Sequence, residues 1–228
     1  MTFAGLVKHS LVDYPGLVAC VVFVPGCNYD CYFCHNRHLL DGTHQSIPQS
    51  EVESFLVRRA GLIDAVVVSG GEPTLQKGLE DFLKRVKDLG YRAKLDTNGA
   101  LPDKVSFLIG KGLIDYVAVD YKAPAALYPK ICGPGADAAQ VRRTIDILLE
   151  SGIPFEVRTT VLPELGMDEL TAMARELPPL PRFVLNRYRV PERLRPGDEP
   201  LALAPAPSPE RLREYAERLR AWQPNVTY

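Results

Sequence analysis

The sequence predicts a single-domain α/β protein, a partial (β/α)6, TIM-like barrel. Three observations favour this fold. Six apolar, β-branched segments recur along the 228 residues, each is followed by a helical or polar stretch, and their hydrophobic runs are typical of parallel strands covered on both faces. A doubly wound parallel sheet is the alternative, because hydrophobic periodicity alone does not separate the two folds.

The expected strands alternate with helices, so right-handed crossovers should place the helices outside the sheet. Six units rather than eight would leave the barrel open at one side. The strands are expected at Leu17–Val24, Asp64–Ser69, Tyr91–Thr97, Asp115–Asp120, Pro154–Val161 and Arg182–Tyr188.

Three of the helices have recognisable ends in the first two thirds of the chain. Ser50 and Glu53 have the spacing of a capping box, which predicts a helix running to about Ala60. Two further amphipathic stretches, with apolar residues at helical spacing, end at Gly90 and Gly152.

The last helix should begin at Ser208, a favoured N-cap residue, with Pro209 in the first helical position. Before it, residues 190–207 are rich in proline and arginine and are expected to form a long ordered loop or lid. A basic surface on this part of the chain could dock an acidic partner, although charge runs are usually solvated. Its arginines are Arg187, Arg189, Arg193 and Arg195.

Composition excludes several classes of function. The 27 Lys and Arg residues nearly balance the 28 Asp and Glu residues, so no overall field favours nucleic acid or an anionic membrane. With 46% hydrophobic residues the chain can bury one substantial core. No apolar run has the length of a signal peptide or a membrane span, which predicts a cytoplasmic protein.

The cysteines carry the strongest chemical signal. Cys27, Cys31 and Cys34 form the pattern C-x3-C-x2-C within "VPGCNYDCYFCHN". In a cytosolic chain such a cluster indicates metal or catalytic chemistry rather than disulfides. Cys20 and Cys132 stand apart and are expected to be buried structural thiols without a role in the site.

Three thiolates leave the identity of the fourth ligand open. His35 could complete a Cys3His zinc site, but it directly follows Cys34, and zinc ligands are normally spaced apart along the chain. An iron–sulfur cluster usually takes four cysteines. With three, one iron would remain open to an exogenous ligand.

The cysteine loop follows the first expected strand, and polar or glycine-rich sequence follows the second to the fifth, where parallel α/β folds place their chemistry. Each stretch alone could be an ordinary turn or a solvated ion pair. Their succession favours a functional site. The stretches are Ser69–Thr74 (SGGEPT), Leu95–Gly99 (LDTNG), Val119–Pro124 (VDYKAP) and Glu156–Pro163 (EVRTTVLP).

The cysteine pattern, with the aromatic Phe33 before the last cysteine and "GGEP" after the next strand, resembles the radical S-adenosylmethionine (SAM) superfamily. The resemblance implies that Cys27, Cys31 and Cys34 hold a [4Fe–4S] cluster whose open iron binds the amino and carboxylate groups of SAM. It extends from about residue 8 to residue 163. No cysteine lies between Cys34 and Gly70, so we expect one cluster only.

The same resemblance implies a role for each further site residue. The backbone at Phe33 would lie near adenine, and Asn36 would orient cofactor or cluster. The methionine amino group would meet Gly70, Gly71 and Glu72, where an ammonium can face carbonyls. A monovalent-cation site beside the SAM carboxylate is implied for Asp96, Thr97 and Asp120. Three further residues, Asn98, Lys122 and Arg158, would help to hold SAM. The positive charges of Lys122 and Arg158 suit its carboxylate.

Within the superfamily the chain is most similar to glycyl-radical-enzyme activases, in particular those of anaerobic ribonucleoside-triphosphate reductase, through "KHSLVDYPG", "CHN" and "DTNG". This implies that a flavodoxin or ferredoxin supplies an electron, and that SAM cleavage yields a 5′-deoxyadenosyl radical. The radical would abstract a hydrogen from a partner's glycine. Asp13 is the candidate for binding the backbone of the partner's glycine loop.

Three other interpretations stay open. A radical SAM enzyme acting on a small molecule should have extra polar residues deep in the barrel, which the sequence does not locate. An activase of a pyruvate formate-lyase type enzyme would share these motifs. A non-enzymatic metal or electron-transfer protein would leave "GGEP", "DTNG" and the Asp120–Lys122 pair unexplained.

Overall fold

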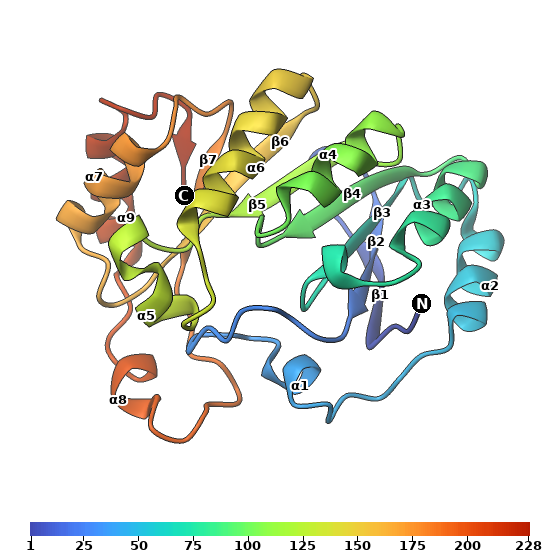
Figure 1. Cartoon of the computed structure of the whole chain (residues 1–228), viewed down its shortest axis with the longest axis horizontal. Coiled ribbons are helices and arrows are strands. Elements are labelled where there is room, and N and C mark those ends of the chain that lie inside the picture. The colour runs from blue at the N-terminus through green and yellow to red at the C-terminus, as the bar shows by residue number, and fades with distance from the viewer.

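The computed structural model describes residues 1–228 as one eight-stranded sheet with its strands in chain order, β1 to β8 (Figure 1). Strands β2 to β7 are parallel, which confirms the six βα units. A doubly wound sheet would reverse its strand order, so the sequential order excludes that alternative. The six strands are β2 (Ala19–Val24), β3 (Ala65–Gly70), β4 (Arg92–Thr97), β5 (Tyr116–Asp120), β6 (Phe155–Val161) and β7 (Phe183–Arg187).

The sheet has two edge strands that the sequence did not reveal. β1 (Gly5–Ser10) pairs antiparallel with β2, so the chain enters the barrel through a hairpin. β8 (Val226–Thr227) adds two residues alongside β7. Neither segment has the apolar run of a central strand, because each covers an edge rather than filling the middle of the sheet.

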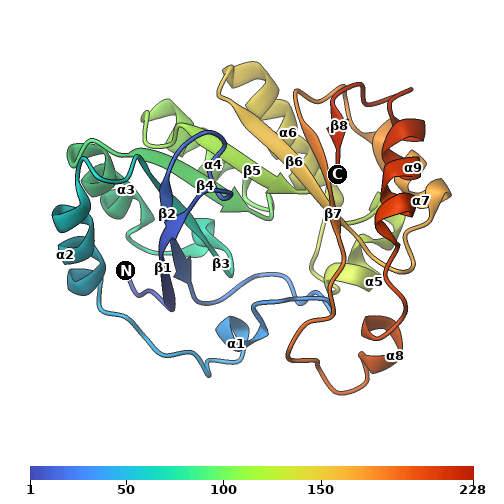
Figure 2. The same cartoon turned by 180° about the vertical axis from the view of Figure 1, so that it is seen from behind.

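The helices cover the outer face of the sheet (Figures 1 and 2). The capping-box prediction is wrong: Ser50 lies inside its helix, which starts after Pro48 without a side-chain cap. Ser208 does cap its helix and accepts a hydrogen bond from the Arg211 N–H. The helices are α1 (Arg37–Leu40), α2 (Gln49–Arg59), α3 (Leu79–Asp88), α4 (Pro102–Gly110), α5 (Tyr128–Cys132), α6 (Ala138–Ser151), α7 (Met167–Glu176), α8 (Glu199–Ala202) and α9 (Pro209–Leu219), with 3-10 turns η1 (Pro73–Leu75) and η2 (Ala125–Leu127).

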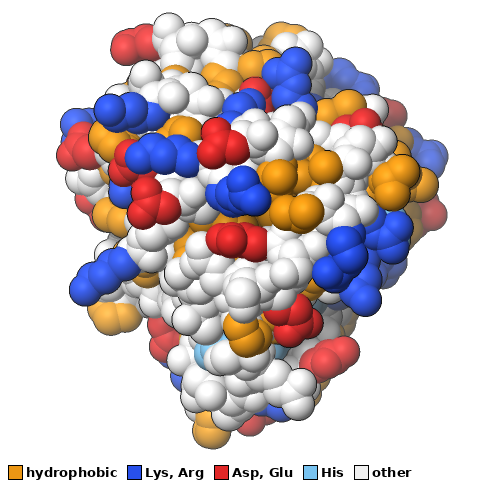
Figure 3. Space-filling view, turned by 90° about the vertical axis from the view of Figure 1, so that its right-hand side faces the viewer, with side chains coloured by type: hydrophobic (Ala, Val, Ile, Leu, Met, Phe, Trp, Pro, Cys, Tyr) orange, Lys and Arg blue, Asp and Glu red, His pale blue; other side chains and the backbone are white.

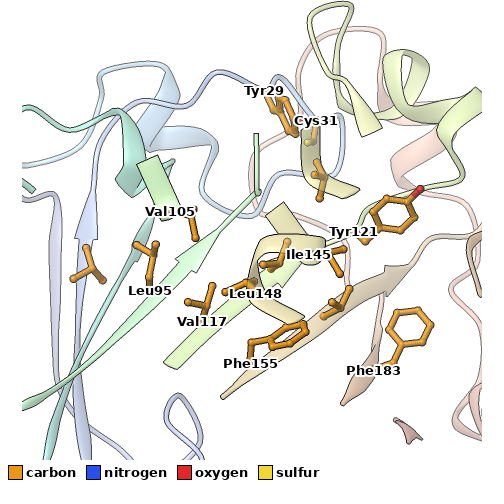
Figure 4. Close-up of a cluster of buried hydrophobic side chains, with 14 of the residues drawn as sticks. Tyr29, Cys31, Leu95, Val105, Val117, Tyr121, Ile145, Leu148, Phe155 and Phe183 are labelled. Atoms are coloured by element: carbon orange, nitrogen blue, oxygen red, sulfur yellow. The ribbon is translucent and has the colours of Figure 1, made fainter. Parts of the chain in front are cut away.

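The main core lies between the sheet and the helices. Figure 4 shows Leu95, Val117 and Phe155 on successive strands, near Ile145 and Leu148 of α6. Inside the barrel the apolar cluster is small and is limited to the floor around Tyr14, β2 and β3. The inner positions of β4 to β6 differ from this floor, because they carry charges. Those positions are Lys94, Asp96, Asp120, Glu156 and Arg158.

Residues 190–207 include α8 and lie on the same side of the sheet as α1 (Figure 2). The Arg195 guanidinium pairs with Asp30 and, at 2.9 Å, with Asp198. Arg193 donates to the Thr43 hydroxyl at 2.7 Å. These contacts tie the segment to the loop that carries the three clustered cysteines.

The surface carries both signs of charge. Figure 3 shows one face on which Lys and Arg side chains are interspersed with Asp and Glu. This agrees with the near-zero net charge of the sequence. No helix is both long and apolar enough to cross a bilayer.

Gln223 provides a test of the packing between α7 and the C-terminal residues. Its side chain is 1% exposed, accepts from the Leu180 N–H and donates to the carbonyls of Ala174 and Pro178. Replacing Gln223 by Leu leaves these backbone groups unpaired, so the free energy of unfolding should fall by about 3 kcal/mol in urea denaturation. Gln140→Leu, at an exposed position of α6, should change it by less than about 0.5 kcal/mol. Equal effects of the two variants would contradict this role.

Candidate functional site

The carboxyl ends of the strands open into a cavity of about 540 Å³. It lies where parallel α/β barrels gather their chemistry. Every candidate site residue except Glu72 lines it. The lining candidates are Asp13, Cys27, Cys31, Phe33, Cys34, Asn36, Gly70, Gly71, Asp96, Thr97, Asn98, Asp120, Lys122 and Arg158, joined by Tyr29, His35, Leu40, Ser69 and Thr160, which the sequence did not single out for this role.

The cysteine loop is held from two sides by backbone hydrogen bonds. The Gly26 N–H donates to the Leu39 carbonyl of α1 at 3.0 Å, and the Asp30 N–H donates to the Cys132 carbonyl of α5 at 2.9 Å. The Arg37 guanidinium donates to the Cys31 carbonyl at 2.6 Å. The loop therefore has a defined path past the cavity.

The surroundings of the sulfur atoms differ. Burial raises the pKa of the Cys27 thiol to about 11, although the Tyr29 N–H donates to its sulfur. The pKa of Cys31 is lowered, chiefly by a hydrogen bond with the Cys132 thiol. Cys132 is fully buried, as expected, but it also contacts a cysteine of the motif, which the sequence did not indicate.

The donor set fits a cluster better than a single ion. The five cysteines are free thiols, and no group of three or more His, Cys, Asp or Glu side chains is placed to hold one metal ion. In an iron–sulfur cube each thiolate binds a different iron, so the sulfur atoms need not converge on one point. The structure therefore gives no support to the Cys3His zinc alternative with His35.

Gly70 and Gly71 let the strand end of β3 approach the cysteine loop. The Gly71 N–H donates to the Val24 carbonyl at 2.8 Å. A Cβ atom on Gly71 would lie 1.9 Å from the Gly26 carbonyl oxygen, and Gly70 has φ +117°. Only glycine fits both positions. The Gly70 carbonyl accepts from the Asn36 amide at 3.2 Å, so Asn36 fixes this edge of the cavity.

Glu72 does not face the cavity. Its carboxylate is fully buried and accepts hydrogen bonds from Thr74, from the Thr97 hydroxyl at 2.7 Å and from the Asn98 N–H at 2.7 Å. Burial raises its pKa, and these bonds oppose the shift. Any contact of this stretch with a ligand must come from its backbone, while the Glu72 side chain joins the ends of β3 and β4.

The opposite wall carries a balanced set of charges. The Arg158 guanidinium bridges Asp96 at 3.2 Å and Asp120 at 3.0 Å, as an arginine paired within a barrel should. Lys122 pairs with Asp120 at 3.0 Å and lies 5.7 Å from the Phe33 ring centroid. Burial lowers the pKa of Lys122, but Asp120 outweighs it and the net pKa is raised. Both cations stay charged at neutral pH.

The comparisons with known proteins agree with this geometry. The family model described as the Radical SAM superfamily matches residues 21–177. A protein of Methanocaldococcus jannaschii, named as a candidate glycyl-radical enzyme activating enzyme, is 30% identical over 98% of this chain and 93% of its own length. A 7-carboxy-7-deazaguanine synthase of Thermococcus kodakarensis is 31% identical over 44% of this chain and 47% of its own.

Among solved structures, SuiB of Streptococcus suis bound to S-adenosylmethionine is similar with a TM-score of 0.64 and 16% identity. The match covers 88% of this chain and 49% of that protein. At this identity the likeness shows the fold, and it confirms the partial barrel.

The close approach at Gly71 can be tested by adding one methyl group. Gly71→Ala should lower the free energy of unfolding by about 3 kcal/mol, because the Cβ atom overlaps the Gly26 carbonyl. Gly135→Ala is the matched control, since a Cβ atom there meets nothing within 4 Å. Chemical denaturation of both variants measures the difference. A stable Gly71→Ala protein would contradict the contact.

The charge network predicts a pH dependence of stability. Burial raises the pKa of Asp120, but Lys122 and Arg158 outweigh it and bring it to about 2, against an ordinary 3.8. The stabilisation is thus complete above about pH 4 and is lost as the pH falls towards 2. The unfolding free energy of the native protein relative to Asp120→Asn should fall by on the order of 1 kcal/mol between pH 5 and pH 3.

Urea denaturation at a series of pH values measures this difference. Asp103→Asn is the control, because Asp103 is 83% exposed in its pair with Arg143. For that variant the difference should be nearly independent of pH. A flat profile for Asp120→Asn down to pH 3 would refute the assignment.

Proposed function

Because the chain belongs to the radical SAM superfamily, we propose that it is a glycyl-radical-enzyme activase that cleaves SAM reductively at a [4Fe–4S] cluster. The observation that carries this proposal is the match to the Methanocaldococcus jannaschii protein, which extends over 98% of this chain. The 7-carboxy-7-deazaguanine synthase matches over 44%. The match over nearly the whole of both chains supports the activase type.

In this proposal Cys27, Cys31 and Cys34 hold the cluster. When bound, the cluster supplies one electron to SAM, which yields methionine and a 5′-deoxyadenosyl radical. The chain contributes electrostatics and position. The Asn98 amide lies 3.7 Å from the Cys27 sulfur, and the Tyr29 N–H lies 3.4 Å from it, so both can donate to a thiolate.

SAM would be held by groups around the 540 Å³ cavity. Lys122 and Arg158 suit its carboxylate, and backbone carbonyls at Gly70 and Gly71 suit its ammonium group. Asn36 would orient the cofactor through its contact with the Gly70 carbonyl. The backbone at Phe33 would lie near adenine, at the wall where Phe33 and Lys122 meet.

A monovalent cation beside the SAM carboxylate would use Asp96, Thr97 and Asp120. The two carboxylates already share the Arg158 guanidinium. A cation would therefore bind after Arg158 turns towards the SAM carboxylate and frees one oxygen on each side. A requirement for sodium or potassium in SAM binding would support this part of the proposal.

The partner we propose is anaerobic ribonucleoside-triphosphate reductase, with a pyruvate formate-lyase type enzyme as the alternative glycyl radical partner. A flavodoxin or ferredoxin would supply the electron. Asp13 lines the cavity and its carboxylate accepts from the Ser10 hydroxyl, which leaves oxygen lone pairs for backbone N–H groups of an entering loop. These roles match a cytoplasmic enzyme.

A small-molecule substrate is the second candidate, and one observation favours it. The structure places the polar residues Lys94 and Glu156 deep in the barrel, where the sequence located none. They pair with each other at 3.6 Å, and Glu156 also pairs with Arg182 at 3.2 Å. Because they are engaged with the protein itself, the activase remains our proposal.

The first experiment is anaerobic reconstitution with iron and sulfide, reduction with dithionite and addition of SAM. We expect 5′-deoxyadenosine, detected by liquid chromatography. Cys31→Ala should reduce its formation by at least about a hundredfold, because a cluster ligand is lost. Cys20→Ala is the matched control, since Cys20 is buried outside the cavity and should leave formation within about twofold.

The partner is tested by adding the anaerobic reductase and recording the glycyl radical by electron paramagnetic resonance. A radical on the reductase that depends on SAM and on Cys31 supports the activase. Rapid 5′-deoxyadenosine formation without any radical on the reductase or on a formate-lyase type enzyme would overturn it in favour of a small-molecule substrate.

A further inference from the structure

Lys94 lies on the inner face of β4, below the cavity, and belongs to none of the proposed cofactor contacts. Its side chain is 2% exposed. A buried ammonium group is costly unless it is paired and hydrogen-bonded. Its partners therefore indicate what it does.

The ammonium group of Lys94 has contacts in two directions. It lies 3.2 Å from Asp96 and 3.6 Å from Glu156 on the barrel strands. On the other side it donates to the main-chain carbonyl of Asp13 at 2.5 Å. One side chain thus connects the charged barrel interior to the loop between β1 and β2.

This loop, residues 10–16, has few other attachments to the barrel. The Ser10 hydroxyl accepts from the N–H groups of Val12 and Asp13, so these bonds are internal to the loop. The Tyr14 ring packs on Tyr116 with centroids 5.5 Å apart. Ser10 ends β1 and pairs with Ala19 of β2; beyond it, Lys94 supplies the hydrogen bond that joins the loop backbone to the parallel strands.

Neutralising the carboxylates does not explain Lys94. Asp96 already pairs with Arg158, and Glu156 already pairs with Arg182. The Asp13 carbonyl has no other donor among the hydrogen bonds of the structure. The contact that depends on Lys94 is the one with the loop.

The loop also presents two apolar side chains to solvent. Leu11 is 78% exposed and Val12 is 87% exposed, more than any other large hydrophobic residue. They precede Asp13, which lines the cavity. Both side chains lie at the amino-terminal end of the parallel strands, because Ser10, at the end of β1, pairs with Ala19 at the start of β2.

We propose that Lys94 is a positioning residue that fixes residues 10–16 at the amino-terminal end of the barrel strands, so that Asp13 is held in the cavity wall, where it meets the partner polypeptide. The identity of the occupant rests on the proposed function. The anchoring of the loop by Lys94 does not, because it involves neither SAM nor the partner.

Hydrogen–deuterium exchange, read by mass spectrometry from milliseconds to minutes, tests the anchoring without cofactor or partner. In Lys94→Met, peptides covering residues 10–17 should exchange at least about fivefold faster than in the native protein. Arg142→Met is the matched control, because the half-buried Arg142 of α6 also loses an ion pair, with Asp146 at 2.9 Å, and a hydrogen bond to a main-chain carbonyl, that of Glu176. Lys94→Arg, which keeps a donor, should restore part of the protection.

Two results would overturn the proposal. One is unchanged exchange of residues 10–17 in Lys94→Met. The other is an equal acceleration across β4, β5 and β6, since Lys94 would then serve the fold and not the loop.

The second test measures the kinetics of activation with the glycyl radical enzyme that this protein activates. Lys94→Met should raise KM for the partner about tenfold and change kcat by less than about twofold, whereas Arg142→Met should change neither. A loss of kcat at unchanged KM would overturn the proposal. If no glycyl radical enzyme is activated, the proposed function fails, but the hydrogen-exchange result still decides whether Lys94 holds the loop. Failure of the proposed function and failure of the anchoring by Lys94 are therefore distinguishable.

Discussion

The buried carboxylate of Glu72 is the contact on which the geometry of the site depends. It joins Thr74, after β3, to Thr97, the last residue of β4, and to Asn98, which follows it. Asn98 in turn donates to Asn28 of the cysteine loop at 2.8 Å. Three loops that are distant in sequence are therefore set by one group, and the cost of burying its charge is offset by four donors.

A second constraint is the charge balance within the barrel. The inner residues of β4, β5 and β6 supply acidic and basic groups in similar number, and each carboxylate has a basic partner. Such an interior suits a zwitterion. When SAM binds as proposed, ion pairs within the protein would be replaced by ion pairs with the cofactor. Both the carboxylate and the ammonium group of SAM would then have a partner of opposite charge.

The sequence predicted the six central strands to within two residues, because buried parallel strands form long apolar runs. It also predicted most of the cavity residues, through motifs at strand ends. It missed Lys94 and Glu156, since single charged residues inside strands carry no spacing signal. Glu72 shows a further limit: sequence marks it as part of a motif but cannot tell a ligand contact from a buried support.

The way in which the cavity is covered by the rest of the chain argues for a large partner. The cysteine loop is closed from outside by Arg195, which reaches Asp30 from the C-terminal segment. At the amino-terminal end of the strands, residues 10–16 place Asp13 in the cavity wall and leave Leu11 and Val12 in solvent. A primary carbon radical attacks whatever lies near it, so the proposed chemistry requires water to be excluded on that side too. A polypeptide that inserts a glycine loop would complete the enclosure, which explains how so short a chain could control such a reaction.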